Sequence, residues 1–374
     1  MEIIKVTGKK EWKQFFRFPW RIYQGDPHWA PPLLMEQKKL LSTRRNPFFL
    51  NGKAQGWISR QKGEMTGRII AFTDPHHNEF HGDKTGFIGF FECLNDQETA
   101  DALFEQAAAW LRSQGMAVAR GPVNLSTANE CGLLASGFEY PPFIQMNHTP
   151  PYYLQLFKNW GFRKVHRLLA YHVVTEELMR KKELLGRLET VSKRVLSQQR
   201  ITLRPLNMRR YQEEVRHIAR LYNAFMNNNW GFVPVTEQEM FFMGESLKLI
   251  VDPEMVFFIE INGAVAGCSL SVPNINQILP RLNGRLFPLG FLKFLYHRSR
   301  INTLRLMLIG VSPGFRNCGL DALLYYYTIT EAARKGYIAA ELSWISEDNA
   351  NLISIMDKLG ARLYKTYWVY DKKI

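Results

Sequence analysis

The sequence predicts an α/β protein of two similar halves, each a mixed central sheet flanked by helices (an α+β arrangement), and three patterns support this fold class. A short aliphatic run, 304–311, is typical of a buried strand, and a turn joins it to a longer apolar segment, 320–333, that is typical of a helix. A second strand and helix pattern follows at 339–344 and 349–361. The first half of the chain repeats this order in a weaker form, which indicates two related domains.

The second half begins with a predicted strand at 201–206 and a predicted helix at 211–226. The pair Asn262-Gly263 then lies between two apolar runs, 255–261 and 264–272. Asn-Gly between such runs is a strong hairpin signal. The predicted order is therefore strand, helices, hairpin, strand, helix, strand, helix and a last strand at the end of the chain.

In the first half, 54–60 and 64–72 are predicted to form a hairpin, and 86–92 a strand. The next segment, 96–114, has apolar residues at helical spacing, and a strand at 116–121 follows it. The residues of this helix that are expected to face the core are Ala100, Leu103, Phe104, Ala107 and Leu111.

The chain is expected to divide near residue 175 into two domains. Residues 176–200 are charged but carry apolar residues at helical spacing, so they are predicted to form a connecting helix. This division places the first domain at 1–175 and the second at 201–374.

The turn after the run 304–311 carries Pro313, Gly314, Gly319 and one arginine, Arg316. A strand-to-helix turn leaves free backbone N–H groups at the start of the helix, and these groups bind phosphate oxygens. An arginine beside them adds charge-assisted hydrogen bonds. The turn is therefore a candidate pyrophosphate site.

The run Val-x-Pro-x-Phe-Arg-x-x-Gly at 311–319 resembles the acyl-CoA pyrophosphate loop of GNAT-type N-acyltransferases. Residues 339–344 are similar to the next strand of that family, and 349–361 to the helix behind it. With its repeated order, the whole chain resembles bacterial tandem GNAT proteins. Between 86–92 and 96–114 the first half has neither Arg nor Gly, so this degenerate domain is expected to have lost the cofactor.

The resemblance implies that the second domain binds acetyl-CoA or another acyl-CoA as co-substrate. It implies transfer of the acyl group to a small-molecule amine with no covalent intermediate on the enzyme. Asn349 is expected either near the cofactor arm or as the cap of the last helix. The donor-binding residues are then Val311, Phe315, Arg316, Asn317, Cys318, Gly319, Leu320 and Asn349.

Glu341 is the candidate general base. An amine must lose a proton before it attacks a thioester, and a carboxylate acting directly or through water is the expected helper. Glu341 lies between the apolar residues Ala340 and Leu342 in a predicted strand. Glu347 is the alternative, but its place near the start of the next helix favours an interaction with the helix dipole.

Two loops are candidate acceptor sites. In the loop after the first helix of the second domain, Trp230 and Phe232 suit the wall of a shaped pocket, although a hydrophobic plug explains them too. Residues 121–134 are polar and turn-rich after a predicted strand, so Asn124 and Asn129 are candidates for binding the acceptor. A capped structural connection is the alternative interpretation of this loop.

Two other functions stay open. Asp321 replaces a small residue of the family's loop, and Met356 replaces the family's usual tyrosine, which favours a non-catalytic acyl-CoA sensor or scaffold. The positive charge and the apolar segment 287–295 favour an N-acyltransferase that takes a long-chain acyl group from an acidic acyl carrier protein.

The 374-residue chain has a net charge of +14, and its basic pairs are spread along the sequence. This dispersed charge favours an anionic cofactor or an acidic partner over nucleic acid, for which the sequence holds no helix-turn-helix or zinc motif. No apolar run approaches the ~20 residues that span a bilayer, and the start lacks the apolar core of a signal peptide.

The four cysteines show no paired or metal-type spacing, so a reduced, cytoplasmic environment is expected. One His-rich cluster lies within residues 74–83, where turn-forming residues predict a hairpin tip rather than a metal site, so no metal is expected. Its members are His76, His77, His81, Asp74 and Asp83.

Overall fold

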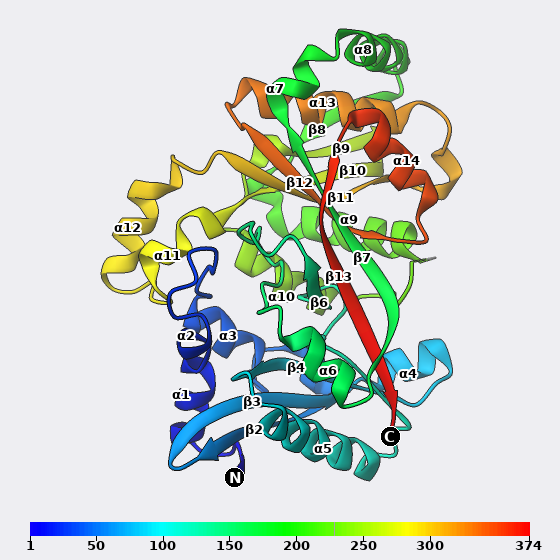
Figure 1. Ribbon diagram of the computed structural model, residues 1–374. Helices are drawn as coiled ribbons and strands as arrows, with labels where there is room; N and C mark the ends of the chain where they lie inside the picture. The colour runs from blue at the N-terminus through cyan, green and yellow to red at the C-terminus, as the bar shows by residue number, and fades with distance from the viewer. Residues whose placement is uncertain (228) are drawn as a thin grey trace. The chain divides into compact units, whose positions relative to one another are not determined.

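The computed structural model describes residues 1–227 and 229–374, and the chain forms two compact units (Figure 1). Unit 1 comprises Met1–Leu168, Leu279–Phe291 and Lys365–Ile374, and unit 2 comprises Leu169–Ile278 and Leu292–Tyr364. Each unit therefore combines segments that lie far apart in the sequence. The domain ranges that the sequence predicts, divided near residue 175, stay a prediction.

Unit 1 contains a mixed sheet in the order β1-β2-β3-β4-β5-β13, in which β4 and β5 are parallel and β6 also pairs with β13. The strands are β1 (Glu2–Lys5), β2 (Lys53–Gln61), β3 (Glu64–Thr73), β4 (Thr85–Cys93), β5 (Val118–Gly121), β6 (Leu133–Ser136) and the end of β13 (Arg362–Lys373). The helical segments are α1 (Lys9–Arg17), α2 (Pro19–Ile22), α3 (Leu34–Leu40), η1 (Pro47–Leu50), α4 (Pro75–His81), α5 (Gln97–Ser113), α6 (Tyr153–Asn159) and α11 (Leu279–Leu282).

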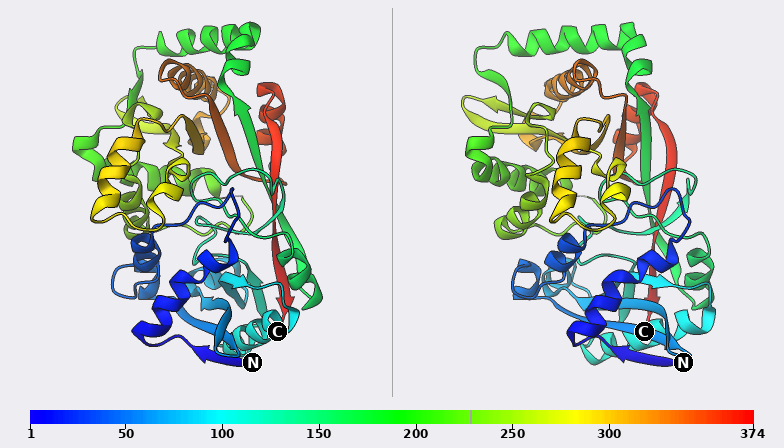
Figure 2. Two further views of the ribbon diagram at one scale, coloured as in Figure 1. Left: turned by 60° about the vertical axis from the view of Figure 1, so that its left-hand side comes forward. Right: turned by 90° about the vertical axis from the view of Figure 1, so that its left-hand side faces the viewer.

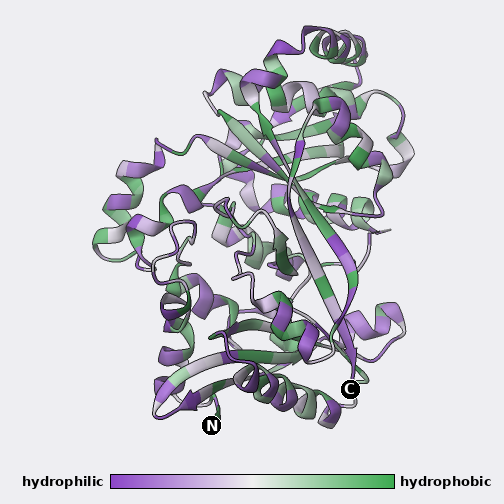
Figure 3. Ribbon diagram, viewed as in Figure 1, coloured by the Kyte–Doolittle hydropathy of each residue, from purple (hydrophilic) through white to green (hydrophobic). Residues whose placement is uncertain are grey.

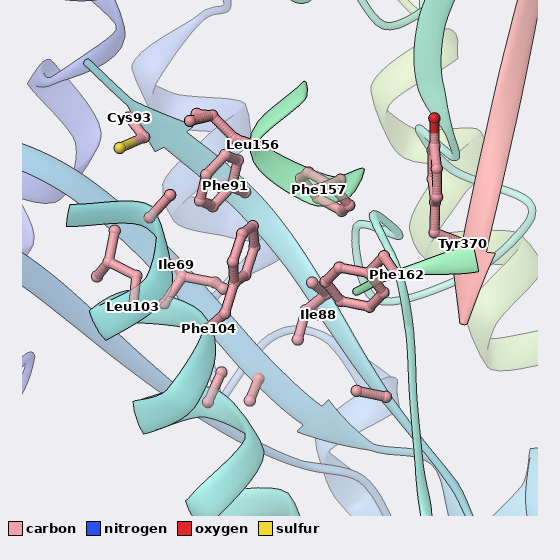
Figure 4. Packing of buried hydrophobic residues seen from close by; sticks show 14 of the residues in the cluster. Ile69, Ile88, Phe91, Cys93, Leu103, Phe104, Leu156, Phe157, Phe162 and Tyr370 are labelled. Atoms are coloured by element: carbon pink, nitrogen blue, oxygen red, sulfur yellow. The ribbon is translucent and has the colours of Figure 1, made fainter. Parts of the chain in front are cut away.

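Helices α5 and α6 cover one face of this sheet, and aromatic side chains fill the space between them (Figure 4). Phe104 of α5 stacks on Phe91 of β4, with ring centroids 4.7 Å apart, and meets Phe157 of α6 edge to face at 4.9 Å. Such pairs add to the free energy of burying the rings themselves. All five residues of α5 that the sequence places in the core are buried, which confirms the helical period.

The His-rich segment lies at the tip of the antiparallel β3–β4 hairpin, as predicted, and it forms a short helix, α4, there. Asp74 is its N-cap and accepts hydrogen bonds from the backbone N–H groups of His76 and His77. Pro75 then occupies the first helical position, where its missing N–H costs nothing. An N-cap aspartate followed by proline is a helix-start signal, and it accounts for the helix at this tip.

The buried ring of His77 in α4 is expected to make the stability of unit 1 depend on pH. The ring is buried, 4.9 Å from Phe87 and 4.4 Å from His81 between centroids. Burial and His81 lower the pKa of His77 from 6.5 to about 4, although Asp83 acts in the opposite direction. The folded chain therefore excludes a proton that the unfolded chain binds below about pH 6.5.

Stability is thus fully present above about pH 6.5 and is expected to fall by up to about 3 kcal/mol as the pH drops toward 4. Urea unfolding at about pH 7 and pH 4.5 measures this loss. His77→Gln should reduce the difference between the two pH values, whereas His76→Gln should leave it unchanged. An equal loss in His77→Gln and in the unaltered protein would assign the pH dependence to other groups.

The strands of unit 2 follow the order β7-β12-β11-β10-β9-β8. The strands are β7 (Arg163–Val174) from Leu169 onward, β8 (Ile201–Pro205), β9 (Val256–Ile261), β10 (Ala264–Pro273), β11 (Thr303–Val311), β12 (Ala339–Ser346) and the start of β13 as far as Tyr364. The helical segments are α7 (Thr175–Arg180), α8 (Lys182–Leu196), η2 (Met208–Arg210), α9 (Tyr211–Met226), α10 (Glu237–Leu247), η3 (Pro253–Met255), η4 (Ile275–Gln277), η5 (Pro313–Phe315), α13 (Leu320–Arg334) and α14 (Ala350–Leu359). Helix α12 (Leu289–Arg298) contains the boundary between residues 291 and 292.

Alternating side chains of β9 direct the helices to opposite faces of this sheet. Phe257 and Ile259 pack with residues of α8 and α13, whereas Val256 and Phe258 pack with residues of α9 and α10. Helix α8 runs beside α13 (Figure 2). The sheet of unit 2 is therefore covered on both faces, as a fold of this class requires.

Most elements of unit 2 match the sequence prediction. Helix α9 spans the predicted residues 211–226, and the hairpin β9–β10 turns at Asn262 and Gly263, both with positive φ. The predicted connecting helix is divided into α7 and α8 at Lys181. Across the described residues, no helix is both long enough and apolar enough to cross a membrane.

Candidate functional site

Strands β11 and β12 of unit 2 run parallel only at their beginnings. Their ladder joins Thr303–Leu306 to Ala339–Leu342. Beyond the last pair, β11 continues to Val311 and β12 continues to Ser346. Where two neighbouring strands no longer pair, the edge of one strand is available for hydrogen bonding. An extended ligand can bond to this edge through its backbone-like groups, as a peptide does when it adds to a sheet. The candidate site lies where β11 extends past this ladder.

The turn from β11 into α13 presents backbone N–H groups at the end of the same strand. Residues 313–318 are exposed, and Pro313–Phe315 form the short helix η5. The N-cap of α13 is Gly319, which has no side chain to accept the first N–H groups of the helix. Because α13 is 15 residues long, its dipole also favours an anion here.

Gly319 is required by both its backbone and its surroundings. Its φ of +79° is a conformation that glycine adopts without strain. A Cβ at this position would lie 2.7 Å from Cγ1 of Val191 on α8, closer than carbon atoms pack. The glycine of the sequence motif thus allows α8 to approach the first turn of α13.

The predicted donor residues lie around this turn. Val311 and Leu320 are buried and anchor its two ends, whereas Phe315 and Arg316 are exposed. Asn317 has a φ of +62°. Cys318 is exposed, and its Sγ lies 3.5 Å from the backbone oxygen of Arg316. The Arg316 guanidinium is thus placed in solvent beside the N-terminus of α13.

Asn349 caps helix α14, which is one of the two roles predicted for it. Its Oδ1 accepts a hydrogen bond of 3.0 Å from the backbone N–H of Leu352. Met356, on the same helix, is fully buried in a cluster with Leu342 and Tyr325. The position at which the family resemblance expects a tyrosine is therefore part of the core of unit 2.

In unit 1, the loop that contains Val123 and Asn124 occupies the region that corresponds to the candidate site of unit 2. The β4–β5 ladder ends at Phe87, and β4 continues to Cys93, as β11 does in unit 2. Here the backbone N–H of Val123 donates to the oxygen of Ile88, and Oδ1 of Asn124 accepts from the N–H of Phe90 at 2.7 Å. These bonds occupy edge positions of β4 that an extended ligand would need.

The N-terminus of α5, the helix that follows β4, is also unfavourable for binding an anion. Asp96 is the N-cap of α5, and its carboxylate accepts a hydrogen bond from the N–H of Thr99 at 3.1 Å. A capping carboxylate satisfies the helix dipole and repels phosphate. A Cβ on Gly89 would lie 1.9 Å from the Val123 oxygen, so this close approach depends on glycine. Unit 1 thus has the strand and the helix, but not an open anion site.

Asn124 and Asn129, which are predicted to bind the acceptor, lie in this filled region of unit 1. Asn124 donates to Oε2 of Glu130 at 2.7 Å, and Asn129 donates to the backbone oxygen of Asn124 at 3.3 Å. These bonds hold the loop onto β4, as in a capped structural connection. Their role in acceptor binding stays a proposal.

Glu341, the candidate base, is fully buried within a polar cluster of unit 2. Its Oε1 accepts a hydrogen bond of 2.5 Å from Ser343, and its Oε2 accepts one from Tyr364. The guanidinium of Arg305 lies 3.8 Å from Oε1 and donates to Oγ of Ser343 at 3.0 Å. Both carboxylate oxygens therefore already have partners, and a proton leaving an amine would reach Glu341 through Ser343 or Tyr364.

Side-chain alternation places this cluster on a defined face of the sheet. Leu342 packs toward α13 and α14, so Glu341 lies on the opposite face. The α9–α10 pair occupies that face along β9 and β10. Phe232, between α9 and α10, is buried 6.0 Å from the Tyr222 ring, and Trp230 is half-buried. The predicted acceptor aromatics of unit 2 thus belong to the layer on the Glu341 side.

Unit 1 holds a buried charged cluster that the sequence analysis did not single out. Arg68 of β3 lies 3.5 Å from Glu92 of β4, whose other oxygen accepts hydrogen bonds from Tyr23 at 3.1 Å and Tyr153 at 2.7 Å. Burial raises the pKa of Glu92, although Arg68 and the tyrosine hydroxyls act in the opposite direction. Because the partners are far apart in the sequence, no local pattern reveals this cluster.

For the described residues, no group of three or more His, Cys, Asp or Glu side chains is arranged to hold a metal ion. In the His-rich segment, Asp74 caps α4, and Nε2 of His77 lies 3.8 Å from Asp83.

Comparison with known proteins identifies full-length relatives of the chain. It is 35% identical over 373 residues to the protein YghO of Escherichia coli, with 98% of this chain and 94% of the relative covered. It is 33% identical over 386 residues to a bacterial ceramide synthase of Caulobacter vibrioides, with 100% and 98% covered. No protein-family model matches the chain.

Among solved structures, a tandem GNAT protein from the clavulanic acid biosynthesis pathway matches with a TM-score of 0.61. The match covers 100% of this chain and 98% of that one, at 12% sequence identity. At such low identity the match concerns the fold. It confirms the tandem GNAT fold that the sequence motifs predict.

Proposed function

The chain belongs to the same family as YghO and the bacterial ceramide synthase and has the tandem GNAT fold, and we propose that it is an N-acyltransferase. It would transfer an acyl group from an acyl thioester bound at the turn before α13 to the amine of a long-chain base. A ceramide is the N-acyl derivative of such a base, so the name of the relative supports this acceptor class.

The observation that carries the proposal is the difference between the two units. In unit 2, helix α13, which follows β11, begins at Gly319 close to the exposed Arg316. In unit 1, the equivalent helix α5, which follows β4, is capped by Asp96. The N-terminus of α13 favours binding of a pyrophosphate, whereas the N-terminus of α5, capped by a carboxylate, disfavours it. One donor site, in unit 2, is therefore proposed.

The proposed reaction joins the amine nitrogen to the thioester carbonyl carbon. As the carbon–nitrogen bond forms, the carbon–sulfur bond breaks, the amine loses one proton and the leaving thiolate gains one. The chain would contribute chiefly by binding the donor at Arg316 and the backbone N–H groups, and by orienting the amine. Glu341 is the proposed proton acceptor, with Tyr364 as the hydroxyl that connects it to the acceptor side.

The length of the acyl chain distinguishes two forms of the proposal. The GNAT resemblance predicts acetyl-CoA, whereas the ceramide synthase relative favours a fatty acyl donor. A carrier-protein thioester is a further source of a fatty acyl group, and the net charge of +14 would attract such an acidic protein.

We expect thermal unfolding of the purified protein to respond to its donor. A ligand at 100 times its Kd stabilises the folded state by about 2.7 kcal/mol, so the melting temperature should rise by roughly 5–10 °C. CoA, acetyl-CoA, palmitoyl-CoA and palmitoyl carrier protein should be compared, each with and without sphinganine. Release of free thiol in the presence of sphinganine then measures acyl transfer.

The outcomes separate the candidate functions. A larger shift with palmitoyl-CoA than with acetyl-CoA, together with thiol release, supports long-chain transfer. A shift without thiol release over a panel of amines would support the non-catalytic acyl-CoA-binding function, which the core position of Met356 and the exposed Asp321 at the start of α13 favour. No shift with any thioester would contradict the donor site.

A further inference from the structure

Helix α12 exposes an unusual concentration of large apolar side chains. Of the fifteen such side chains that are exposed in the described chain, five lie between residues 287 and 296. The exposed fractions are 64% for Phe287, 68% for Leu289, 63% for Leu292, 49% for Leu295 and 65% for Tyr296. Single exposed apolar residues are ordinary, but a contiguous group marks a surface for binding. We call these five residues the α12 surface.

The helical period gathers these residues on one side of α12. Leu289, Leu292 and Tyr296 follow one another at spacings of three and four residues, so they share a face. Phe294 is buried on another face and anchors the helix. Phe287 precedes the helix and stacks on Phe291, with ring centroids 5.8 Å apart. Four of the five residues of the α12 surface therefore project from this helix, and Phe287 lies just before it.

Basic side chains flank the α12 surface, and acidic ones are absent from its neighbourhood in the sequence. Residues 261–320 contain no Asp or Glu. Arg285, Lys293, Arg298 and Arg300 are all exposed. Arg300 donates a hydrogen bond of 3.1 Å to the Tyr296 hydroxyl, which places a cation beside the polar end of this aromatic side chain. The ribbon of α12 carries both hydrophobic and hydrophilic residues (Figure 3).

We propose that the α12 surface docks on an anionic phospholipid membrane. A helix lying in the plane of a bilayer buries its apolar side chains at the boundary between headgroups and acyl chains. Each basic residue near that plane gains by attraction to anionic headgroups. An acidic protein would pair with the basic residues, but it would also need an apolar patch of matching shape, whereas a membrane provides both environments.

The proposal goes beyond the acyl transfer proposed above and does not depend on it. Residues of the α12 surface are distinct from Arg316 and Glu341, and membrane binding needs neither an acyl donor nor an amine. Its biological consequence is simple: a protein bound in this way would meet lipid substrates at the surface in which they are dissolved.

Sedimentation with lipid vesicles tests the proposal. We expect the full-length protein to bind vesicles of phosphatidylcholine with phosphatidylglycerol, to bind phosphatidylcholine alone far less, and to be released by salt. Leu289→Asn with Leu292→Asn should lower the partition coefficient by about tenfold or more. Lys293→Gln with Arg298→Gln should lower it by roughly 20- to 30-fold, since each basic residue contributes about fivefold.

A matched control uses the exposed Leu50 and Leu249, which lie outside the α12 surface. Leu50→Asn with Leu249→Asn should leave vesicle binding unchanged, and all variants should keep the melting temperature of the unaltered protein. Absence of binding to phosphatidylglycerol vesicles would overturn the proposal. So would vesicle binding that the α12 variants retain.

Two other occupants of the surface give distinguishable results. If light scattering shows a dimer that the leucine variant dissociates, and vesicles do not bind, the surface belongs to a second copy of the chain and the proposal is wrong. If palmitoyl carrier protein binds through these residues and vesicles do not, the same conclusion follows for a protein partner.

Discussion

Arg316→Ala is expected to weaken CoA binding by roughly 10- to 100-fold, the factor that a lost charge-assisted hydrogen bond to phosphate produces. The residue is exposed beside the N-terminus of α13, so its removal should not disturb the core. Isothermal titration calorimetry of the purified variant measures the change in Kd, and the melting temperature without ligand should stay unchanged.

Arg209→Ala is the matched control for this loss. Arg209 is an exposed arginine of unit 2 in the short helix η2, away from the turn before α13 in the sequence. Its replacement removes the same charge from the protein, so any general effect of net charge on an anionic ligand appears in both variants. Equal Kd values for Arg316→Ala and Arg209→Ala would exclude Arg316 from the donor site.

Salt dependence offers a second measure of the same contact. A guanidinium that pairs with phosphate in solvent is screened by added ions, so CoA affinity of the unaltered protein should fall as ionic strength rises. Arg316→Ala should show a weaker salt dependence than Arg209→Ala. The backbone N–H groups at the start of α13 remain in both variants and should retain part of the affinity.

The second large effect is expected at Glu341. Glu341→Ala should lower the free energy of unfolding by about 3–5 kcal/mol, because it leaves the buried guanidinium of Arg305 without its carboxylate. For a unit of this size the melting temperature should fall by about 10 °C. Differential scanning calorimetry measures the loss.

A surface ion pair of unit 2 provides the control. Glu189 and Lys193 on α8 form an i,i+4 pair at 2.6 Å, with side chains 41% and 75% exposed. Solvent screens such an exposed pair, so Glu189→Ala should change the melting temperature far less than Glu341→Ala. A similarly small effect of Glu341→Ala would mean that Arg305 finds other partners and that the cluster does little for stability.

Glu341→Gln separates stability from chemistry, since glutamine keeps the shape of the side chain but does not accept a proton at neutral pH. If Glu341 is the proton acceptor, kcat for thiol release should fall by about 100-fold or more, while the Kd for CoA stays the same. Tyr364→Phe should lower kcat as well if that hydroxyl transmits the proton. An unchanged kcat in Glu341→Gln would leave this residue a purely structural role.

Much of the local structure follows from short-range patterns. The helical spacing in 96–114 predicts both α5 and its buried face, and Asn262-Gly263 predicts the β9–β10 hairpin. The Pro and Gly residues of 311–319 predict the turn between β11 and α13. These predictions succeed because each depends on backbone preferences and side-chain spacing within a few turns of the chain.

Other features depend on partners distant in the sequence, and local patterns do not specify them. The last strand is predictable as a strand, but its pairing of Tyr370 with Gly121 in unit 1 is not. The hydrogen bond that the backbone N–H of Phe90 in β4 donates to Oδ1 of Asn124 also joins residues far apart in the sequence. The burial of Glu341 against Arg305 and Tyr364 is likewise a long-range property.

The sequence alone thus determined the type and order of most helices and strands, the likeness to tandem GNAT proteins, and the loop that carries Arg316. Only the tertiary structure decided that β4 of unit 1 is occupied by the chain's own loop, that both oxygens of Glu341 have partners, and that the leucines of α12 face solvent. The physical reason is that backbone preference acts over a few residues, whereas burial and hydrogen-bond satisfaction are settled by the whole folded chain.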